Sequence, residues 1–415
     1  MRVLVLAGRI ARPRWTSGHL ITALCGALIA RGMKVDIACR SLDDTPPTPT
    51  SPLAAAASIA CFDRFCQTAT DFPAGFASWA ARQRRDTPHD VSLSLTRFAA
   101  ADVFFPIDPT GAAWLRRALQ TRPAPALARA LSRHHGAFRA LARETFRRLP
   151  YAPADRPTRR ILAVGPTAAA EAQRLLTPTG LADRVRTLPF FSALTPPNPD
   201  HLADLRTRTR ALLAIPADRR VVLVSAPTPV GSVLDGLLRG IADMHTRYRG
   251  HADVPILLIL ARDAFAAHAA AARTGALPHT HILTPTDHIE APLAAADLCA
   301  LATPAAIGQF EYGATGRLAA DALRTGRPLI ALSGASGYDL ARHIFPDSSR
   351  PGLTIDTSAP DVWQRALRTA CEERWLEDSS HAATRIGDTL TPEPFHAAIL
   401  TALTEAAAER ANPTL

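Results

Sequence analysis

The sequence predicts an α/β protein built from two doubly wound, Rossmann-like domains with parallel sheets. The first observation is a repeated alternation of short apolar strands with helical segments, which is typical of parallel βαβ units buried on both faces. The second is a proline-rich stretch at residues 192–200, SALTPPNPD, which divides the alternation into two series. The third is the length, since 415 residues suffice for two or three domains, and 47% hydrophobic with 20% charged residues is an ordinary globular composition.

The first series opens with a clear βαβ unit. We expect a strand at residues 2–7, a helix at 17–30 with apolar side chains at helical spacing, a stop at Gly32 and a second strand at 34–39. The same pattern then predicts strands at 91–95, 103–107 and 161–164 and helices at 125–149 and 167–176.

The alternation starts again after the proline-rich stretch. Strands are expected at residues 221–225, 255–261, 281–283, 298–302, 329–332 and 353–355. These positions predict domains at 1–191 and 201–390 with a linker at 192–200. The C-terminal segment 391–415 contains an amphipathic helix that could cross back to the first domain. Ligands of such sheets bind at the carboxyl ends of the strands, so we expect the two domains to face each other across a ligand-binding cleft.

The charge is unevenly distributed along the chain. The net charge is +10, yet residues 1–190 hold 27 arginines and lysines against 13 aspartates and glutamates, and the remainder holds 20 against 24. Either the first half faces an anionic partner, such as nucleic acid, anionic lipid or a phosphorylated glycan, or its surface is merely rich in arginine. Aromatic residues are only 6% and no nucleic-acid-binding module is recognisable, so we expect no nucleic-acid partner.

One segment is compatible with attachment to a membrane surface. In residues 133–148 arginines alternate with Phe138, Leu141 and Phe146, a basic amphipathic pattern typical of interfacial helices, although an ordinary domain helix would look the same. Trp79 and the basic residues at 82–85 belong to the same domain. No apolar run reaches the roughly 18–20 residues of a spanning helix, and no signal peptide is recognisable. We therefore expect a cytoplasmic protein that binds the inner face of the cytoplasmic membrane peripherally, if at all.

The six cysteines are scattered and form neither a C-x-x-C pair nor a Cys/His cluster at zinc spacing. In a cytosolic chain of this size we expect them to be buried as small hydrophobic residues rather than to form disulfides or a metal site. The chain also lacks a D-x-D motif, so we expect no metal ion and no other cofactor.

The segment at residues 313–330, GATGRLAADALRTGRPLI, is the strongest candidate for a binding site. A glycine-rich turn opens a helix, and free backbone N–H groups at a helix start attract anions. Arg317 stands in the first turn, where a cation opposes the helix dipole unless an anion is bound there, and Asp321 follows one turn later on the same face. The alternative is an ordinary connection between strand and helix with an exposed arginine.

The same segment resembles the nucleotide-sugar-binding motif of family-4 type retaining glycosyltransferases, which have the GT-B fold. Their motif has two glutamates eight residues apart followed by Ala-x-x-x-Gly-x-Pro and a hydrophobic strand. Asp321 takes the place of the second glutamate, and Ala322, Gly326, Pro328, Leu329 and Ile330 follow in register. Residues 294–301 (AAADLCAL) and 333–340 (SGASGYDL) resemble the elements on either side of the motif. Near the N-terminus, Ser17-Gly18-His19 and residues 31–35 resemble the acceptor-side loop and the strand start of that family.

Within this family the chain is most similar to lipopolysaccharide-core α-1,3-glucosyltransferases. Residues 89–97 and 102–108, the triplet Arg133-His134-His135, and Glu144 follow the order and spacing of that subgroup's acceptor domain. Residues 161–166 match its strand before the second domain, with Gly165 where that subgroup has serine. The resemblance extends over residues 1–375.

Two departures from the family motif concern the donor site. The first glutamate of the pair falls at Gly313, which has no side chain, although Glu311 could substitute. The arginine and lysine that usually hold the donor diphosphate are missing from residues 224–232 (VSAPTPVGS). Gly231 and Ser232 still begin a helix whose N–H groups could bind phosphate, and Arg317 is the basic residue that the motif offers nearest to the phosphates.

The resemblance and these departures together assign expected roles. Donor-binding residues are expected at Gly231, Ser232, Glu311, Gly313, Gly316, Arg317, Leu318 and Asp321. We expect Arg317, Asp108 and His19 to take part in catalysis, with Asp108 orienting the acceptor; the alternatives are a capping aspartate and a surface histidine. Gly18, Arg97 and His134 are expected on the acceptor side.

The expected function is transfer of a hexose from a nucleotide-diphosphate sugar to a glycan acceptor. The resemblance implies retention of configuration and a lipid-linked, lipopolysaccharide-core or exopolysaccharide acceptor, with the leaving phosphate removing the acceptor proton. The alternative is a degenerate GT-B protein that binds a nucleotide sugar, or a partner glycosyltransferase, without turnover, because part of the donor motif is missing.

Overall fold

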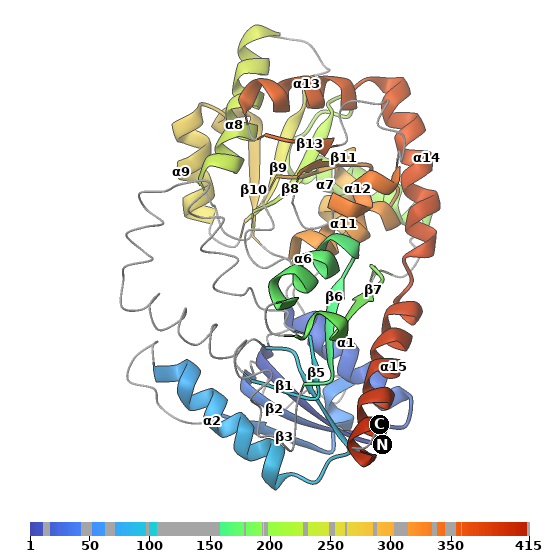
Figure 1. The fold of residues 1–415 in the computed structure, drawn as a ribbon. Coiled ribbons are helices and arrows are strands. Elements are labelled where there is room, and N and C mark those ends of the chain that lie inside the picture. The colour runs from blue at the N-terminus through green and yellow to red at the C-terminus, as the bar shows by residue number, and fades with distance from the viewer. Residues whose placement is uncertain are drawn as a thin grey trace. The chain divides into compact units, whose positions relative to one another are not determined.

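The computed structural model describes two compact units. The first comprises Met1–Phe190 together with the C-terminal segment from Glu393, and the second comprises Phe191–Ala305 and Ala314–Pro392 (Figure 1). The described residues are 1–10, 17–42, 52–62, 71–96, 99–105, 158–177, 180–192, 194, 198–226, 231–248, 254–261, 264–284, 289–302, 314–333, 338–344, 354–357 and 359–412.

The first unit is built on a seven-stranded sheet in the order β3-β2-β1-β4-β5-β6-β7, in which all pairs are parallel. The strands are β1 (Arg2–Ile10), β2 (Lys34–Leu42), β3 (Ser58–Cys61), β4 (Val91–Ser94), β5 (Val103–Phe104), β6 (Arg160–Val164) and β7 (Val185–Leu188). Strands β4 and β5 are buried along their whole length. In β4 apolar residues alternate with Ser92 and Ser94, whose buried hydroxyls donate to the Asp102 carboxylate and to the Thr96 carbonyl.

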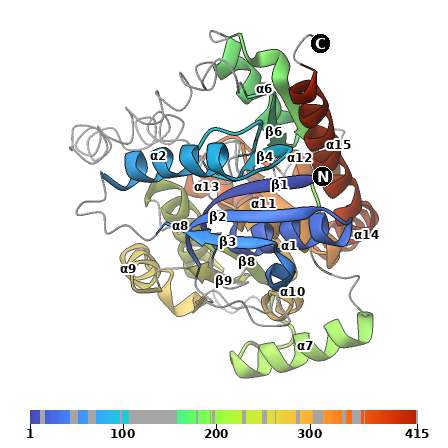
Figure 2. The ribbon, with the colours of Figure 1, turned by 90° about the horizontal axis from the view of Figure 1, so that it is seen from below.

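Helices cover this sheet from both sides. They are α1 (Ser17–Ala30), α2 (Asp71–Asp86), α6 (Pro166–Leu176) and α15 (Pro392–Ala411), with short 3₁₀ turns η1 (Pro52–Ala55) and η3 (Ala182–Arg184). In Figure 2, α1 and α2 lie on either side of strands β1 and β2. On the α2 side, Phe62 and Phe76 meet edge to face with ring centroids 5.8 Å apart, and Trp79 packs against both. Trp79 is therefore a partly buried residue of α2 that packs against the hydrophobic core of the first unit.

The C-terminal helix α15 packs on the first unit. Phe395, fully buried, lies 6.0 Å from the ring of Phe105, and further along α15 Glu409 forms ion pairs with Arg159 and Arg160. The helix is therefore part of the first unit's hydrophobic core although it follows the second unit in sequence.

The second unit contains a six-stranded parallel sheet in the order β10-β9-β8-β11-β12-β13. Its strands are β8 (Val221–Ala226), β9 (Ile256–Ala261), β10 (Thr280–Leu283), β11 (Leu298–Leu301), β12 (Leu329–Leu332) and β13 (Thr354–Ile355). Its helices are α7 (Pro199–Leu212), α8 (Gly231–Arg247), α9 (Ala264–Thr274), α10 (Glu290–Ala295), α11 (Ala314–Arg324), α12 (Tyr338–Ile344), α13 (Pro360–Ala370) and α14 (Glu373–Thr389), with a 3₁₀ turn η4 (Leu277–His279).

The predicted pair of doubly wound parallel sheets is confirmed, and the differences are local. Pro199 and Asp200, expected in the linker, instead begin α7, because Asn198 caps the helix by accepting from the Asp200 amide and proline is favourable at the first helical position. Strands β3 and β7 and helix α2 were not expected. Both strands lie at sheet edges and are short and partly exposed, so they lack the apolar run of a central strand. The expected helix at 125–149 lies outside the described residues.

The five cysteines in the described residues are all free thiols. Four are buried as expected, but Cys61 is exposed because it ends the edge strand β3. It faces Cys39 in register on β2, with the two sulfur atoms 3.5 Å apart. Cys66 lies outside the described residues. Among the residues that the structure describes, no helix is both long and apolar enough to cross a membrane.

Two histidines of the second unit stack face to face. The rings of His245 on α8 and His279 on η4 are parallel, with centroids 3.5 Å apart, and His245 Nε2 lies 3.0 Å from the Pro255 carbonyl oxygen. Burial lowers the pKa of His245 to about 4, helped by His279 and Arg219. The stack is therefore neutral at pH 7.

Acidification is expected to destabilise the second unit through His245. His245 takes up a proton near pH 6.5 in the unfolded chain and only near pH 4 in the folded chain. The stability that neutral His245 contributes is therefore complete above pH 6.5 and is lost as the pH falls toward 4. We expect a loss of about 2 kcal/mol in the free energy of unfolding by pH 5, measured by urea denaturation. The variant His245→Gln should lose most of this difference between pH 7.5 and pH 5. Equal pH dependence in the two proteins would contradict the assignment.

Candidate active site

Both sheets have a switch point at which a ligand site is expected. In the second sheet β9 and β10 are added on one side of β8 and β11, β12 and β13 on the other, so the order of successive strands reverses between β8 and β11. Helix α8 follows β8 and helix α11 follows β11, which places both helix starts at the carboxyl edge of the sheet. The first sheet has its switch between β1 and β4, and α1 follows β1 there.

Helix α11 carries the central part of the predicted motif. It begins at Ala314, so Gly316 and Arg317 both lie in its first turn, and the predicted stop is confirmed because Gly326 adopts φ 72°. The side chain of Leu318 is 2% exposed, and Leu323 on the same helix is also buried. The side chain of Leu318 is therefore part of the protein interior and is not exposed to solvent.

Arg317 and Asp321 form a buried ion pair on this helix. Arg317 Nε lies 3.3 Å from Asp321 Oδ2, the contact expected for side chains one turn apart. Arg317 is 9% exposed and Asp321 is 1% exposed. The hydroxyl of Ser192 donates a hydrogen bond of 2.7 Å to the other carboxylate oxygen, Asp321 Oδ1.

Opposing effects act on the Asp321 carboxyl. Burial raises its pKa and outweighs the influence of the Arg317 guanidinium and the Ser192 hydroxyl, which lower it, while the nearby negative charge of Glu290 raises it slightly. Such perturbation is typical of functional sites, although buried structural ion pairs produce it too.

Helix α14 holds α11 in place through an unusually close contact. Arg324 Nη1 donates to the Gly387 carbonyl at 3.0 Å, and a Cβ atom added to Gly387 would lie only 2.2 Å from the carbonyl oxygen of Leu323. Figure 1 shows α14 running alongside α11 and α12. Only glycine allows the two helix backbones to approach this closely.

The variant Gly387→Ala is therefore expected to push α11 away from α14. We expect a loss of about 1–3 kcal/mol in the free energy of unfolding, the usual range for an added methyl group in a packed interior, measured by urea denaturation. His381→Ala, at an exposed position of α14, is the matched control and should change stability by less than about 0.5 kcal/mol. Equal free energies of unfolding for Gly387→Ala and His381→Ala would show that α11 and α14 can separate without loss of stability.

The structure places some predicted site residues and not others. Gly231 and Ser232 begin α8 as predicted, and Gly18 and His19 lie in the first turn of α1. Arg317 and Asp321 are in contact. The remaining candidates, Arg97, Asp108, His134, Glu311 and Gly313, lie outside the described residues, as does the basic segment 133–148. The predicted roles of all of these residues stay predictions.

Ser192 is the site residue that sequence reasoning missed. It entered the prediction only as the first residue of a linker, yet it contacts Asp321 across 129 positions of sequence. Its backbone N–H donates to the Leu390 carbonyl at 2.8 Å, which fixes it against the end of α14. No local pattern marks such a residue, because the contact is defined only by the tertiary fold.

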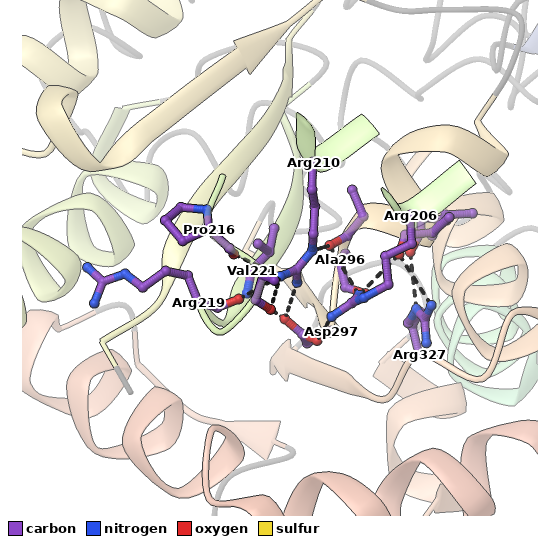
Figure 3. Close-up of polar contacts among 12 residues, drawn as sticks. Arg206, Arg210, Pro216, Arg219, Val221, Ala296, Asp297 and Arg327 are labelled. Atoms are coloured by element: carbon purple, nitrogen blue, oxygen red, sulfur yellow. Dashed lines mark hydrogen bonds and ion pairs between the residues drawn. The ribbon is translucent and has the colours of Figure 1, made fainter. Parts of the chain in front are cut away.

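A second charged cluster lies at the opposite, amino edge of the second sheet (Figure 3). Asp297, just before β11, accepts from the Val221 amide at 2.7 Å and pairs with Arg206 at 2.6 Å and Arg210 at 2.8 Å. Arg206, Arg210 and Arg327 also donate to carbonyl groups at the end of α10, where the negative end of the helix dipole favours cations. This cluster is a structural clamp that joins α7, α10, β8 and β11.

The first unit repeats this arrangement. Both units have the sequence Ala-Ala-Ala-Asp before a strand, at residues 99–102 and 294–297. Asp102 accepts from the Ser92 amide at 2.8 Å and pairs with Arg84 at 3.4 Å, as Asp297 does with Val221 and Arg210. The stretch at 294–301 that resembles the family therefore has a structural role. No group of three or more metal-binding side chains occurs within the described ranges.

Comparison with known structures defines the fold. The chain is similar to WaaG, a glycosyltransferase involved in lipopolysaccharide biosynthesis, with a TM-score of 0.68 and 16% identity over 96% of this chain and 99% of that one. It is similar to HepE from Anabaena in complex with UDP and glucose, with a TM-score of 0.64 and 14% identity over 98% of this chain and 100% of that one. It is also similar to α,α-trehalose-6-phosphate synthase from Burkholderia multivorans, with a TM-score of 0.62 and 12% identity over 100% of this chain and 98% of that one.

The predicted GT-B architecture is thereby confirmed, with one Rossmann-like unit on each parallel sheet. No protein-family model matches the sequence, and a search of curated proteins finds no match either.

Proposed function

We propose that this protein is a retaining glycosyltransferase that moves a hexose from a nucleotide-diphosphate sugar to a lipid-linked, lipopolysaccharide-core or exopolysaccharide glycan. The observation that carries the proposal is the carboxyl edge of the second sheet, where α8 and α11 both begin and α11 carries a buried arginine in its first turn. Structures of similar fold support it, since HepE was solved with UDP-glucose and WaaG acts in lipopolysaccharide biosynthesis.

The proposed reaction breaks the bond between the sugar's anomeric carbon and a phosphate oxygen and forms a new glycosidic bond to the acceptor. Negative charge grows on the departing diphosphate. The backbone N–H groups at the starts of α8 and α11 and the Arg317 guanidinium stabilise that charge. The leaving phosphate accepts the proton of the acceptor hydroxyl, so this route requires neither a side-chain base nor a metal ion.

In this proposal the acceptor binds to the first unit. Helix α1 begins at the switch point of the first sheet, and Gly18 and His19 lie in its first turn. The excess of arginine in residues 1–190 suits an acceptor that bears phosphate groups or lies at an anionic membrane surface. Asp108, Arg97 and His134 remain the proposed acceptor-side residues.

A panel of nucleotide sugars tests the proposal. At least one of UDP-, ADP- and GDP-hexoses should raise the melting temperature of the purified protein, and nucleoside diphosphate should be released when a glycolipid extract is added. Stabilisation without release in any extract would support the binding-only alternative. No stabilisation by any member of the panel would overturn both the glycosyltransferase proposal and the binding-only alternative.

Membrane attachment through the basic first unit predicts binding that depends on salt. The screening length shrinks from about 10 Å at 0.1 M to about 3 Å at 1 M salt, so association with vesicles of anionic phospholipid should fall steeply over this range. Vesicle flotation measures it, with neutral phosphatidylcholine vesicles as the control. Absence of the protein from anionic vesicles at low salt would exclude the peripheral-membrane hypothesis.

A further inference from the structure

Both oxygens of the Asp321 carboxylate have partners among the described residues. Oδ1 accepts from the Ser192 hydroxyl at 2.7 Å, Oδ2 faces Arg317 Nε at 3.3 Å, and the residue is 1% exposed. A ribose hydroxyl bound to this buried carboxylate would have to share an oxygen with the Ser192 hydroxyl or the Arg317 guanidinium. Aspartate is also one methylene shorter than the glutamate of the family motif, so its carboxylate reaches less far from the helix.

Arg317, in contrast, has an unused hydrogen-bonding group. Its Nε is turned toward Asp321, and its Nη1 is buried with no hydrogen-bond partner among the residues that the structure describes. A buried guanidinium nitrogen without an acceptor costs free energy, and a bound anion would supply the missing acceptor. The first turn of α11 favours an anion for a second reason, the positive end of the helix dipole.

Ser192 fixes the geometry of this pair. Its backbone N–H is bound to the Leu390 carbonyl, and its hydroxyl oxygen accepts from the Leu194 amide at 3.1 Å while donating to Asp321. The hydroxyl proton is therefore directed at Oδ1. This leaves Oδ2 to hold Arg317 in one orientation.

We infer that Asp321 is a positioning residue, which with Ser192 holds Arg317 so that Nη1 donates to the phosphates of a nucleoside diphosphate, and that Asp321 does not contact the ribose. The inference rests on the proposed function and deepens it. It also explains how this chain binds a diphosphate without the basic pair that is missing from residues 224–232.

The test separates the phosphates of the ligand from its ribose. The probes are UDP and uridine, or ADP or GDP with its nucleoside if that diphosphate is the one that stabilises the wild type. Affinities are measured by calorimetry, with competition for the weaker nucleoside. Asp321→Asn should weaken diphosphate binding about tenfold, because a charged hydrogen bond loses its orientation, and leave nucleoside affinity within about twofold.

A double-mutant cycle identifies the route of the effect. In the Arg317→Ala background, Asp321→Asn should have no further effect on diphosphate affinity, because its effect acts only through the guanidinium. Ser192→Ala should give a smaller loss in the same direction and serves as the milder variant if Asp321→Asn does not fold. Its fold is checked by thermal denaturation.

The outcomes are distinguishable. An equal loss of nucleoside and diphosphate affinity in Asp321→Asn would show that the carboxylate binds ribose, and the same losses persisting without Arg317 would show that it acts on the ligand directly. Either result overturns the inference and leaves the proposed function standing. Failure of the wild type to bind any diphosphate overturns both.

Discussion

Replacing Arg317 by alanine is expected to lower kcat by roughly 10²–10³, the loss typical of removing one donor to a developing charge. The charge on the diphosphate grows as the glycosidic bond breaks, so a cation aimed at it acts more on the transition state than on the bound donor. Affinity for the nucleotide sugar should therefore fall much less than kcat. Steady-state kinetics with the donor found by the panel, together with calorimetry, separates the two effects.

Arg317→Lys is the matched control for this prediction. It keeps the charge but loses the planar guanidinium that contacts Asp321 with one nitrogen and leaves another for a ligand, so we expect an intermediate rate. An active enzyme whose Arg317→Ala variant retains the wild-type rate would contradict the role of Arg317 in compensating for the missing basic pair.

Replacing Asp297 by alanine is expected to destabilise the protein by about 3–5 kcal/mol, the cost of removing one partner from a buried ion pair. Asp297 is 7% exposed and pairs with Arg206 and Arg210 while accepting from the Val221 amide. Without it, the buried Arg210 guanidinium and the partly exposed Arg206 guanidinium lose their counter-charge, and a strand amide loses its acceptor. The free energy of unfolding in urea measures the effect.

An exposed ion pair of the same unit is the control. Asp361 and Arg365 on α13 lie 2.9 Å apart with more than half of each side chain exposed. Asp361→Ala should cost less than about 1 kcal/mol, because solvent already screens the pair. Similar losses for Asp297→Ala and Asp361→Ala would contradict the assignment of a structural clamp at the amino edge of the sheet.

Sequence patterns predicted the elements whose signals are local. Helix α1 has the predicted bounds because its apolar spacing is followed by Gly32, which adopts φ 77°, and β12 is a short run buried along its whole length. The start of α7 was missed because proline was interpreted as a linker signal, although it also favours the first position of a helix. The edge strand β7, with two exposed residues between two buried ones, has no distinctive apolar pattern.

The candidate site was predictable to a similar degree. The spacing of four residues predicts that Arg317 and Asp321 share one face of a helix, and they are in contact. Burial of that pair, its link to Ser192 and the close approach of Gly387 depend on segments distant in sequence, which no local pattern reveals. The clamp at Asp297 was visible only as a family-like stretch, because its arginines come from α7 and from the residue after Gly326.

The most direct test of a nucleotide-sugar site at the carboxyl edge of the second sheet is hydrogen–deuterium exchange with and without a saturating concentration of the nucleoside diphosphate that stabilises the protein. We expect slower exchange in peptides that contain the starts of α8, at Gly231, and of α11, at Ala314–Leu318, because in our proposal those backbone N–H groups bind the phosphates. Peptides from α9 should not change and serve as the internal reference. Saturable binding that leaves both helix starts unprotected would contradict a nucleotide-sugar site at this edge of the sheet.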